Sequence, residues 1–446
     1  MTADLVLSNA KAYVNKELLD CSLAIDGRKI LRIGHETKMP KAEKRYDLRN
    51  LLVLPGLIDT HVHLRDENKA FKEDFVSGTS AAAAGGVTTV LDMPNNNPVT
   101  MSAEALRNRT KIADNRILVN VGFYSEFPWS MEEIEEIVNE GAIGFKLFMA
   151  EQIGGLNVDD DDDLSQALGI AARLDATVAV HAEDQKLLKE AEDDLKGKKR
   201  NDIDAFLQMH SEEVEEKAVK RLLNIANKTG VHLHFCHVST KGALQAIADA
   251  KKAGTQITCE ATPHHLLLSS DDLAKIGTKA LTMPPLRSKQ QIAALWNGIK
   301  NGWIDTVGSD HAPHALKEKT SSNVWDVKVG IPGLETTLPL LLNEVKARRL
   351  SISDVVYLMA ERPAEIFHLN GKGVLKEGND ADLTIVDLQR KCRIDSSRFY
   401  SKGKYSPFDG WVTEGMPVKT FVNGQLVMDD GEIVSRAGTG QIVRNE

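Results

Sequence analysis

The stretch "IDTHVHLRD", residues 58–66, directly follows the apolar run "LLVLPGL" of residues 51–57. In a β-strand, residues two positions apart point to the same face. Asp59, His61, His63 and Arg65 therefore share one face of the strand that this stretch predicts. Two imidazoles on one face can hold a metal ion, although an HxH pair alone is equally typical of histidines with structural roles.

Short β-rich segments of this kind alternate with helical patterns along the middle of the chain. The alternation predicts parallel strands joined by helical crossovers. Eight such segments within residues 51–371 predict an α/β fold, a (βα)8 TIM-type barrel whose active site lies at the C-terminal ends of the strands. The segments are "LLVLPGLIDTHVH", "GVTTVLDMPN", "RILVNVGFYS", "AIGFKLFM", "TVAVHAED", "VHLHFCHVS", "QITCEATPH" and "IDTVGSDHAPH".

The two ends of the chain differ from this middle. Residues 1–50 and 372–446 carry short strand patterns with "DG" and "NG" turns. We expect them to form one small β-sandwich-like domain built from both termini, beside a barrel of residues 51–371. The acidic run "DDDDD" at residues 159–163 is typical of a solvated loop.

Composition excludes several classes of protein. A hydrophobic fraction of 42% and a charged fraction of 27% over 446 residues are typical of a soluble globular protein. The net charge of −9, without a basic block, argues against a nucleic-acid partner and favours a small-molecule substrate. The four cysteines contain no CxxC pair, which argues against a disulfide framework. With no leader pattern and no long apolar run, we expect a cytoplasmic protein without a membrane partner.

Further candidate ligands lie at the ends of other predicted strands. His181, His237 and Asp310 close the fifth, sixth and eighth strands. Together with His61 and His63 they offer nitrogen and oxygen ligands suited to zinc or a similar divalent ion. This clustering at one rim of the barrel favours a metal site over isolated structural histidines.

Lys146 lies inside the apolar run "GFKLF" at the end of the fourth strand. Burial lowers the pKa of a lysine and leaves a neutral amine, which can take up carbon dioxide as a carbamate. Such an anion could bridge two cations. For an isolated lysine, a side chain that reaches to the barrel mouth is the better interpretation, but the five neighbouring ligands favour the bridge.

Structural or supporting roles are expected for the other residues of this kind. Asp59 is a plausible partner behind a ligand imidazole. The histidines to which we assign no ligand role are His232, His234, His264, His265, His35, His210 and His368.

These motifs resemble the amidohydrolase superfamily, and within it the long dihydroorotases that use a carboxylated lysine. The likeness covers almost the whole chain, including "PGLIDTHVHLRD", "GGVTTVLDMPNNNP", "GFKLFM", "HAED", "HVST", "CEATPHHLLLS", "GSDHAPH" and "GIPGLET". It implies the reversible, zinc-dependent interconversion of (S)-dihydroorotate and N-carbamoyl-L-aspartate in de novo pyrimidine (UMP) biosynthesis.

The resemblance also implies a role for each site residue. His61, His63 and Asp310 would bind one zinc ion, His181 and His237 the other, and carboxylated Lys146 would bridge them. Asp310 would also be the catalytic acid and base. An aspartate a few residues later replaces the lysine in some relatives, but here only Glu151 offers that alternative, which favours Lys146.

Substrate contacts follow from the same resemblance. Arg65, Asn95 and His314 match residues that bind the substrate carboxylate, and the arginine offers a planar pair of donors for it. The other matching positions are His63, Val329, Gly330 and Met283. Met283 departs from the family pattern, because "MPPLR" stands where many dihydroorotases have "NPPLR", and a thioether cannot replace an amide.

Two alternatives stay open at this stage. The same fold and metals could act on another ring, as in a hydantoinase or allantoinase, although those relatives lack the arginine and asparagine pair. A metal-free, non-catalytic dihydroorotase-like scaffold that supports aspartate transcarbamoylase is less favoured, because this chain retains all six ligands. Self-association or association with aspartate transcarbamoylase would accord with the family, and the sequence identifies no interface.

Overall fold

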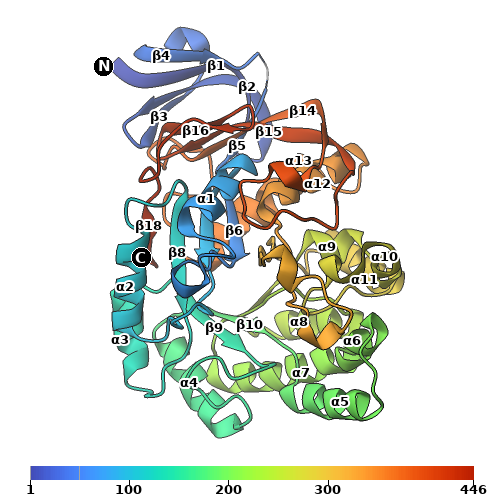
Figure 1. Ribbon diagram of the computed structural model, residues 1–446. Helices are drawn as coiled ribbons and strands as arrows, with labels where there is room; N and C mark the ends of the chain where they lie inside the picture. The colour runs from blue at the N-terminus through green and yellow to red at the C-terminus, as the bar shows by residue number, and fades with distance from the viewer. Residues whose placement is uncertain (1, 50, 446) are drawn as a thin grey trace.

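The computed structural model describes residues 2–49 and 51–445. Its centre is a barrel of parallel strands in sequential order, and a parallel bridge between Val62 and His311 brings the first strand beside the last to close the barrel almost completely (Figure 1). The barrel strands are β6 Leu57–Val62, β7 Val87–Asp92, β8 Asn120–Ser125, β9 Gly144–Phe148, β10 Val178–His181, β11 Leu233–Phe235, β12 Ile257–Ala261 and β13 Thr306–Val307. The predicted α/β barrel is confirmed.

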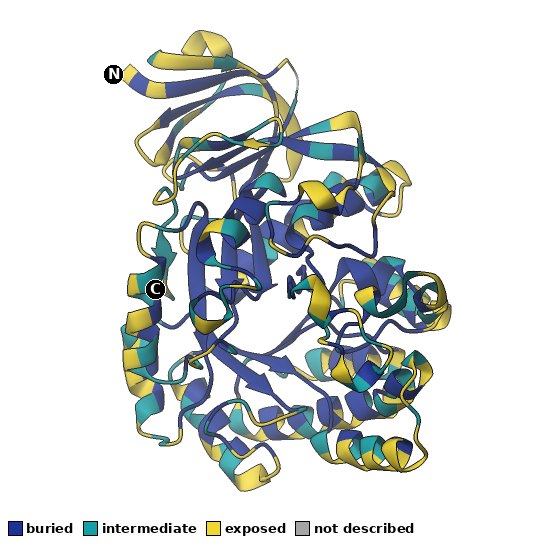
Figure 2. Ribbon diagram, viewed as in Figure 1, coloured by how far each residue is buried: buried dark blue, intermediate teal, exposed yellow. Residues whose placement is uncertain are grey.

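Helices cover the outside of the barrel, and their apolar faces pack against the strands. Figure 2 shows the strands buried throughout and the outer faces of the helices exposed, as expected when both faces of a parallel sheet are covered. The helices are α1 Phe75–Ala84, α2 Ala103–Ala113, α3 Glu133–Glu140, α4 Asp161–Arg173, α5 Gln185–Gly197, α6 Ile203–Met209, α7 Glu212–Thr229, α8 Lys241–Lys252, α9 Pro263–Leu267, α10 Ser270–Ile276, α11 Lys289–Lys300, α12 Leu334–Lys346, α13 Ile352–Val356 and α14 Arg362–Ile366.

The N-terminal end of the barrel is closed by the residues that follow α14. Phe367 is fully buried and packs edge-on against Tyr124 of β8. Thr177, which immediately precedes β10, donates its hydroxyl hydrogen to the carbonyl oxygen of Ile366 over 3.0 Å. Only the opposite, C-terminal end of the barrel is therefore available for a site among the strand ends.

Strands from both ends of the chain form a second sheet above the barrel (Figure 1). It contains β1 Thr2–Val14, β2 Glu17–Asp26, β3 Lys29–Gly34, β4 Lys41–Asp47, β5 Leu52–Pro55, β14 Leu383–Arg393, β15 Val412–Val422, β16 Gln425–Asp429 and β17 Glu432–Ile433. The expected β-domain made from both termini is thus present. Two short strands cross the expected boundaries, because β5 pairs in this sheet and β18 (Ile442–Val443) pairs with barrel strand β8.

Two further segments differ from or add to the expectations. The acidic run at residues 159–163 does not form a loop throughout: Asp160 caps α4 by accepting from the backbone N–H groups of Asp162 and Asp163, and carboxylates in a first turn complement the helix dipole. Residues 394–411 leave the terminal sheet and pack Ile394, Phe399 and Phe408 against the barrel side of the molecule. Within the described ranges, no helix combines the length and apolar character that a membrane crossing requires.

Candidate metal centre and active site

The predicted ligands meet at the C-terminal end of the barrel. Each lies at or directly after the end of a strand, where side chains of successive parallel strands converge. All are buried: His61, His63, Lys146, His181, His237 and Asp310. The structure therefore brings all six side chains together, as the sequence predicts, and their roles as ligands are taken up below as a proposal.

His61, His63 and Asp310 form the first group. Asp310 Oδ1 lies 3.3 Å from His61 Nε2 and 3.3 Å from His63 Nε2. One ligand atom from each residue lies within 4.8 Å of the others, as the ligands of a single ion must. Asp310 adopts a left-handed backbone conformation, with φ of 46°, which is uncommon for a residue other than glycine and recurs at functional sites.

His181 and His237 form the second group. Nδ1 of His181 lies 3.0 Å from Nε2 of His237. The other ring nitrogen of His181, Nε2, lies 2.9 Å from a carboxylate oxygen of Glu183, so it carries the hydrogen and Nδ1 keeps a lone pair. The His237 ring is also 5.2 Å from that of His61, which places the two groups side by side.

Lys146 lies on β9, next to β10. Its side chain is 0% exposed, and its Nζ is 3.0 Å from Cys236 Sγ. Within residues 2–49 and 51–445 it forms no ion pair. A buried amine without a carboxylate partner is costly as a cation, which makes it a suitable group for conversion to an anionic carbamate.

The donor set fits divalent cations. Four imidazoles and one carboxylate turn toward one buried space. The ring nitrogens of His181 and His237, 3.0 Å apart, could each donate a lone pair to the same cation. A second possible set of three donor atoms shares His61 and adds Cys236 and Glu260. The amidohydrolase-type prediction of a metal-dependent centre is consistent with this geometry.

Carboxylates behind the imidazoles orient them. Glu260 on β12 places Oε1 2.9 Å from His61 Nδ1, and Glu183 accepts from both His181 and His210, whose Nδ1 is 2.8 Å away. Burial alone would raise the pKa of Glu260 and of Glu183, but the charges and hydrogen bonds of these histidines outweigh it and lower both values. The imidazoles of His61 and His181 are thus each fixed in one orientation.

The sequence prediction for these supporting residues was partly wrong. Asp59 does not hold an imidazole; its carboxylate accepts from the backbone N–H groups of His61 and Ser309. His210, for which a structural or supporting role was expected, orients Glu183. The buried Nε2 atom of His264 has no partner among the described residues. Residues two positions apart in an extended segment point to the same face, so the spacing of His181 and Glu183 would have predicted that their side chains lie together.

The predicted substrate-binding residues lie at the rim of the same space. Arg65 is buried, and its Nη2 is 3.5 Å from Nε2 of His314. Asn95 contacts a predicted ligand: its Oδ1 lies 2.8 Å from His63 Nδ1. Gly330 donates its N–H to the carbonyl oxygen of Leu281 over 2.9 Å.

Backbone geometry explains the glycine at this rim. Gly330 has φ of 129°, and an added Cβ would lie 2.5 Å from the carbonyl oxygen of Ala312. Val329 precedes it and is partly buried. Met283 is also partly buried, in the segment whose Leu281 bonds to Gly330.

The C-terminal segment contributes residues that the sequence did not indicate. The Tyr405 hydroxyl donates to the carbonyl oxygen of Gly330 and accepts from the backbone N–H of His314, both over 3.1 Å. Ser401 bonds to the buried Glu73, which also contacts His311. Residues 401–405 therefore brace the rim of the barrel mouth, although they lie 75 to 328 positions from these partners in the sequence.

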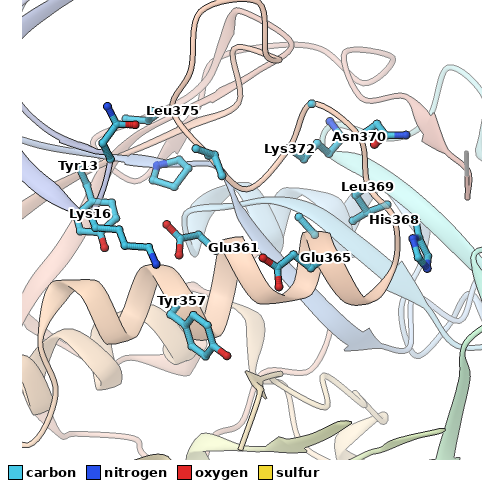
Figure 3. A pocket seen from close by; sticks show the side chains of 15 residues that line it. Tyr13, Lys16, Tyr357, Glu361, Glu365, His368, Leu369, Asn370, Lys372 and Leu375 are labelled. Atoms are coloured by element: carbon cyan, nitrogen blue, oxygen red, sulfur yellow. The ribbon is translucent and has the colours of Figure 1, made fainter. Parts of the chain in front are cut away.

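A cavity of about 560 Å³ lies elsewhere, between the terminal sheet and the helix that ends in α14. Figure 3 shows Glu361 and Glu365 on that helix, with Lys16 and Tyr13 opposite. Its lining includes none of the predicted ligands, and it lies at the N-terminal end of the barrel. The chemistry of the strand ends, rather than the size of a cavity, therefore locates the candidate site.

Comparisons with known proteins agree with this geometry. The Amidohydrolase family profile matches residues 52–427. The dihydroorotase of Methanothermobacter thermautotrophicus is 37% identical over 448 residues, covering 99% of this chain and 98% of that protein. The L-hydantoinase of Paenarthrobacter aurescens is 33% identical over 447 residues, covering 99% and 98%.

Solved structures give the same result. The L-hydantoinase (dihydropyrimidinase) structure from Arthrobacter aurescens superimposes with a TM-score of 0.95 at 32% identity, covering 99% of this chain and 100% of that one. The D-hydantoinase structure from Thermus sp. has a TM-score of 0.92 at 27% identity, covering 99% and 98%. The family match and these relatives together identify the chain as a cyclic amidohydrolase. Fold, strand-end site and relatives together establish that it belongs to the amidohydrolase family.

Proposed function

We propose that this cyclic amidohydrolase is a dihydroorotase, which interconverts (S)-dihydroorotate and N-carbamoyl-L-aspartate in pyrimidine biosynthesis. The observation that carries the proposal is the buried Arg65, whose guanidinium meets His314 at the rim of the candidate metal centre. A buried guanidinium is suited to a carboxylate, and dihydroorotate has a ring carboxylate that hydantoin lacks.

The proposed centre would hold two zinc ions. His61, His63 and Asp310 would bind one and His181 and His237 the other, with Lys146 carboxylated between them. Carboxylation would join the amine nitrogen to carbon dioxide and release one proton. Bound divalent cations supply an activated water and polarise the ring carbonyl.

The protein's own groups then have separate tasks. Arg65, Asn95 and His314 hold the carboxylate, and the backbone of Val329 and Gly330 borders the ring. Asp310 takes a proton at its carboxylate as water adds to the ring carbonyl carbon. It returns that proton to the ring nitrogen as the C–N bond breaks, and ring closure runs these steps in reverse.

A hydantoinase or allantoinase activity is the second candidate. Met283 favours it, because this position would lack the amide that many dihydroorotases present to their substrate. The likeness to the L-hydantoinase structure of Arthrobacter aurescens also supports this candidate.

An assay of the zinc-loaded protein with dihydroorotate, hydantoin and allantoin side by side distinguishes the candidates. We expect kcat/KM to be highest for dihydroorotate. Turnover of hydantoin or allantoin without turnover of dihydroorotate would reject the proposal. Elemental analysis of the protein as purified, after expression with added zinc, tests the non-catalytic scaffold, which would be metal-free.

The family likeness also supports a cytoplasmic enzyme that associates with itself or with aspartate transcarbamoylase. Light scattering of the protein alone, and after mixing with aspartate transcarbamoylase, tests both associations. A mass that stays at one chain in both measurements would reject them.

A further inference from the structure

A cluster of hydrogen-bond donors surrounds the His314 ring. Lys72, in the loop before α1, places Nζ 3.0 Å from His314 Nδ1. On the other side of the ring, Arg65 Nη2 lies 3.5 Å from His314 Nε2. A carboxylate oxygen of Glu318 is also 3.6 Å from Nδ1, beyond hydrogen-bonding distance. The nearest neighbour of each ring nitrogen is therefore a side chain that is a cation in water.

The contact with Lys72 determines which nitrogen of His314 carries the hydrogen. An ammonium group has three donors and no acceptor. Nδ1 must therefore accept from Lys72, and the hydrogen of the neutral ring lies on Nε2. Burial, together with the charges of Arg65 and Lys72, lowers the pKa of His314 and keeps the ring neutral, although the backbone carbonyl of Val329 opposes this shift.

Arg65 and His314 offer no acceptor to one another. A guanidinium also has only donors, so Arg65 Nη2–H and His314 Nε2–H face one another and neither can accept from the other. Arg65 Nε is buried and has no partner among the described residues. Donors that converge in this way are satisfied by an anion with two oxygens, such as a carboxylate.

Lys72 is itself held in place. Its Nζ forms a 3.0 Å ion pair with Glu318, and its side chain is only 11% exposed. Glu318 also accepts from the backbone N–H of Ala315, next to His314. Glu318 thus fixes Lys72 relative to the loop that carries His314.

We infer that Lys72 is a positioning residue for substrate specificity: by donating to His314 Nδ1 it fixes the Nε2–H form, which donates with Arg65 to the substrate carboxylate. The inference rests on the proposed dihydroorotase function and adds a residue to it. Lys72 does not touch the substrate, so its effect passes through His314. The outcome is selectivity for rings that carry a carboxylate.

Replacement of Lys72 by Met tests this inference, with Lys72→Arg and Lys69→Met as matched variants. Lys69 is a second cation near Arg65, but it donates to the carbonyl oxygen of Asn95 rather than to His314. We expect Lys72→Met to raise KM for dihydroorotate at least about tenfold, the effect of one charge-assisted hydrogen bond, with kcat and zinc content little changed. Lys72→Arg should restore most of the affinity, and Lys69→Met should have a smaller effect.

A double-mutant cycle with His314→Ala shows whether the effect passes through the ring. In the His314→Ala background, Lys72→Met should raise KM no further. Equal effects of Lys72→Met and Lys69→Met, or additive effects of Lys72→Met and His314→Ala, would overturn the inference.

Equilibrium binding of orotate, a ring with the same carboxylate, separates this inference from the proposed function. Weaker orotate binding in Lys72→Met but not in Lys72→Arg would support the role of Lys72 even if dihydroorotate were not turned over. Orotate binding that is unchanged in Lys72→Met would reject it even if dihydroorotate were turned over.

Discussion

Three residues of the candidate site have left-handed backbone conformations. The φ angles are 59° for Arg65, 36° for His237 and 46° for Asp310. Such conformations cost energy in residues with a side chain and persist where the surroundings impose them. The carbonyl oxygen of Arg65 accepts from buried Arg109 over 3.1 Å, and the N–H of His237 donates to Glu260 over 3.1 Å. Hydrogen bonds behind the site thus hold the backbone of Arg65 and of His237 in place.

Replacement of Asp310 by Asn should abolish most of the activity. An amide cannot take up the proton that the proposed reaction requires, and loss of a general acid–base group typically lowers turnover by about 10²- to 10⁴-fold. The measurement is kcat for dihydroorotate, with the melting temperature as a check on folding. Asp326→Asn, at an exposed position, is the control. Near-normal turnover in Asp310→Asn would contradict the assigned role.

Glu126, directly after β8, should make stability depend on pH. Burial raises the pKa of its carboxyl group to about 8, opposed only by the Phe127 N–H and the charge of Lys146, whereas the ordinary value is 4.5. The folded-state pKa is raised, so the stability that this group contributes is present below pH 4.5 and is lost as the pH rises through about 8. The loss is at most about 5 kcal/mol.

The corresponding variant is Glu126→Gln, which cannot ionise. Its melting temperature relative to the parent protein should increase between pH 5 and pH 9. Glu132→Gln, at an exposed position just before α3, serves as the control. If the melting temperatures of Glu126→Gln and the parent differed by the same amount at pH 5 and at pH 9, Glu126 would not be a neutral buried acid.

At this scale the sequence indicated where the candidate ligands gather but not their supports. The gathering of His61, His63, His181, His237 and Asp310 could be predicted because each residue type and its place at a strand end are local properties of the sequence. Glu260 and His210 were missed, because their partners His61 and Glu183 lie far away or on another element. Asp59 was assigned to an imidazole although its partners are backbone groups.

At the scale of elements, the strand ends and the loops after them shape the site together. Gly308, just after β13, leaves room for the carboxylate of Glu260 on the neighbouring strand β12, because an added Cβ would lie 2.2 Å from Glu260 Oε2. That carboxylate receives a hydrogen bond from Thr60 on β6, adjacent to His61. The first, seventh and eighth strands are thus linked around one buried acid.

Replacement of Glu260 by Gln should loosen the proposed metal centre. His61 would lose its charged partner, and loss of such partners typically weakens metal binding by about 10- to 100-fold. Competition with a zinc chelator measures the effect, and Glu43→Gln in the exposed part of β4 is the control. If zinc affinity were the same in Glu260→Gln as in the parent, Glu260 would have no part in holding the ligand.

The elements themselves were largely predictable. Buried parallel strands appear as continuous apolar runs, such as "VTTVLD" and "GFKLF", and all eight were identified. β5 was assigned to the barrel with β6, because only Gly56 separates two apolar runs that pair in different sheets. The acidic run was taken for a loop, because capping by Asp160 depends on where the helix begins.

At the scale of the whole molecule, the C-terminal segment joins the two parts of the chain. After β14 it crosses to the barrel mouth, where Ser401 reaches Glu73 and Tyr405 reaches Gly330, before β15 returns to the terminal sheet. Contacts between residues more than 300 positions apart in the sequence, such as Ser401 and Glu73, cannot be inferred from local sequence patterns. They make the rim of the site depend on both ends of the chain.

Removal of metal should lower both activity and stability. A ligand that binds only the folded state stabilises it by about 2.7 kcal/mol at a hundred times its Kd. We therefore expect a chelator to abolish turnover and to lower the melting temperature by about 3 °C, and added zinc to restore both. Full activity in the chelated protein, with zinc shown to be absent by elemental analysis, would contradict the metal-dependent mechanism.

The central claim is that Arg65 makes this amidohydrolase a dihydroorotase, and the ratio of kcat/KM for dihydroorotate to that for hydantoin tests it most directly. The zinc-loaded parent should favour dihydroorotate. Arg65→Met should lower kcat/KM for dihydroorotate by at least about tenfold, the effect of one hydrogen bond to a charged group, with zinc content and any turnover of hydantoin unchanged. A parent protein that turns over hydantoin but not dihydroorotate, or an Arg65→Met variant with an unchanged ratio, would contradict the claim.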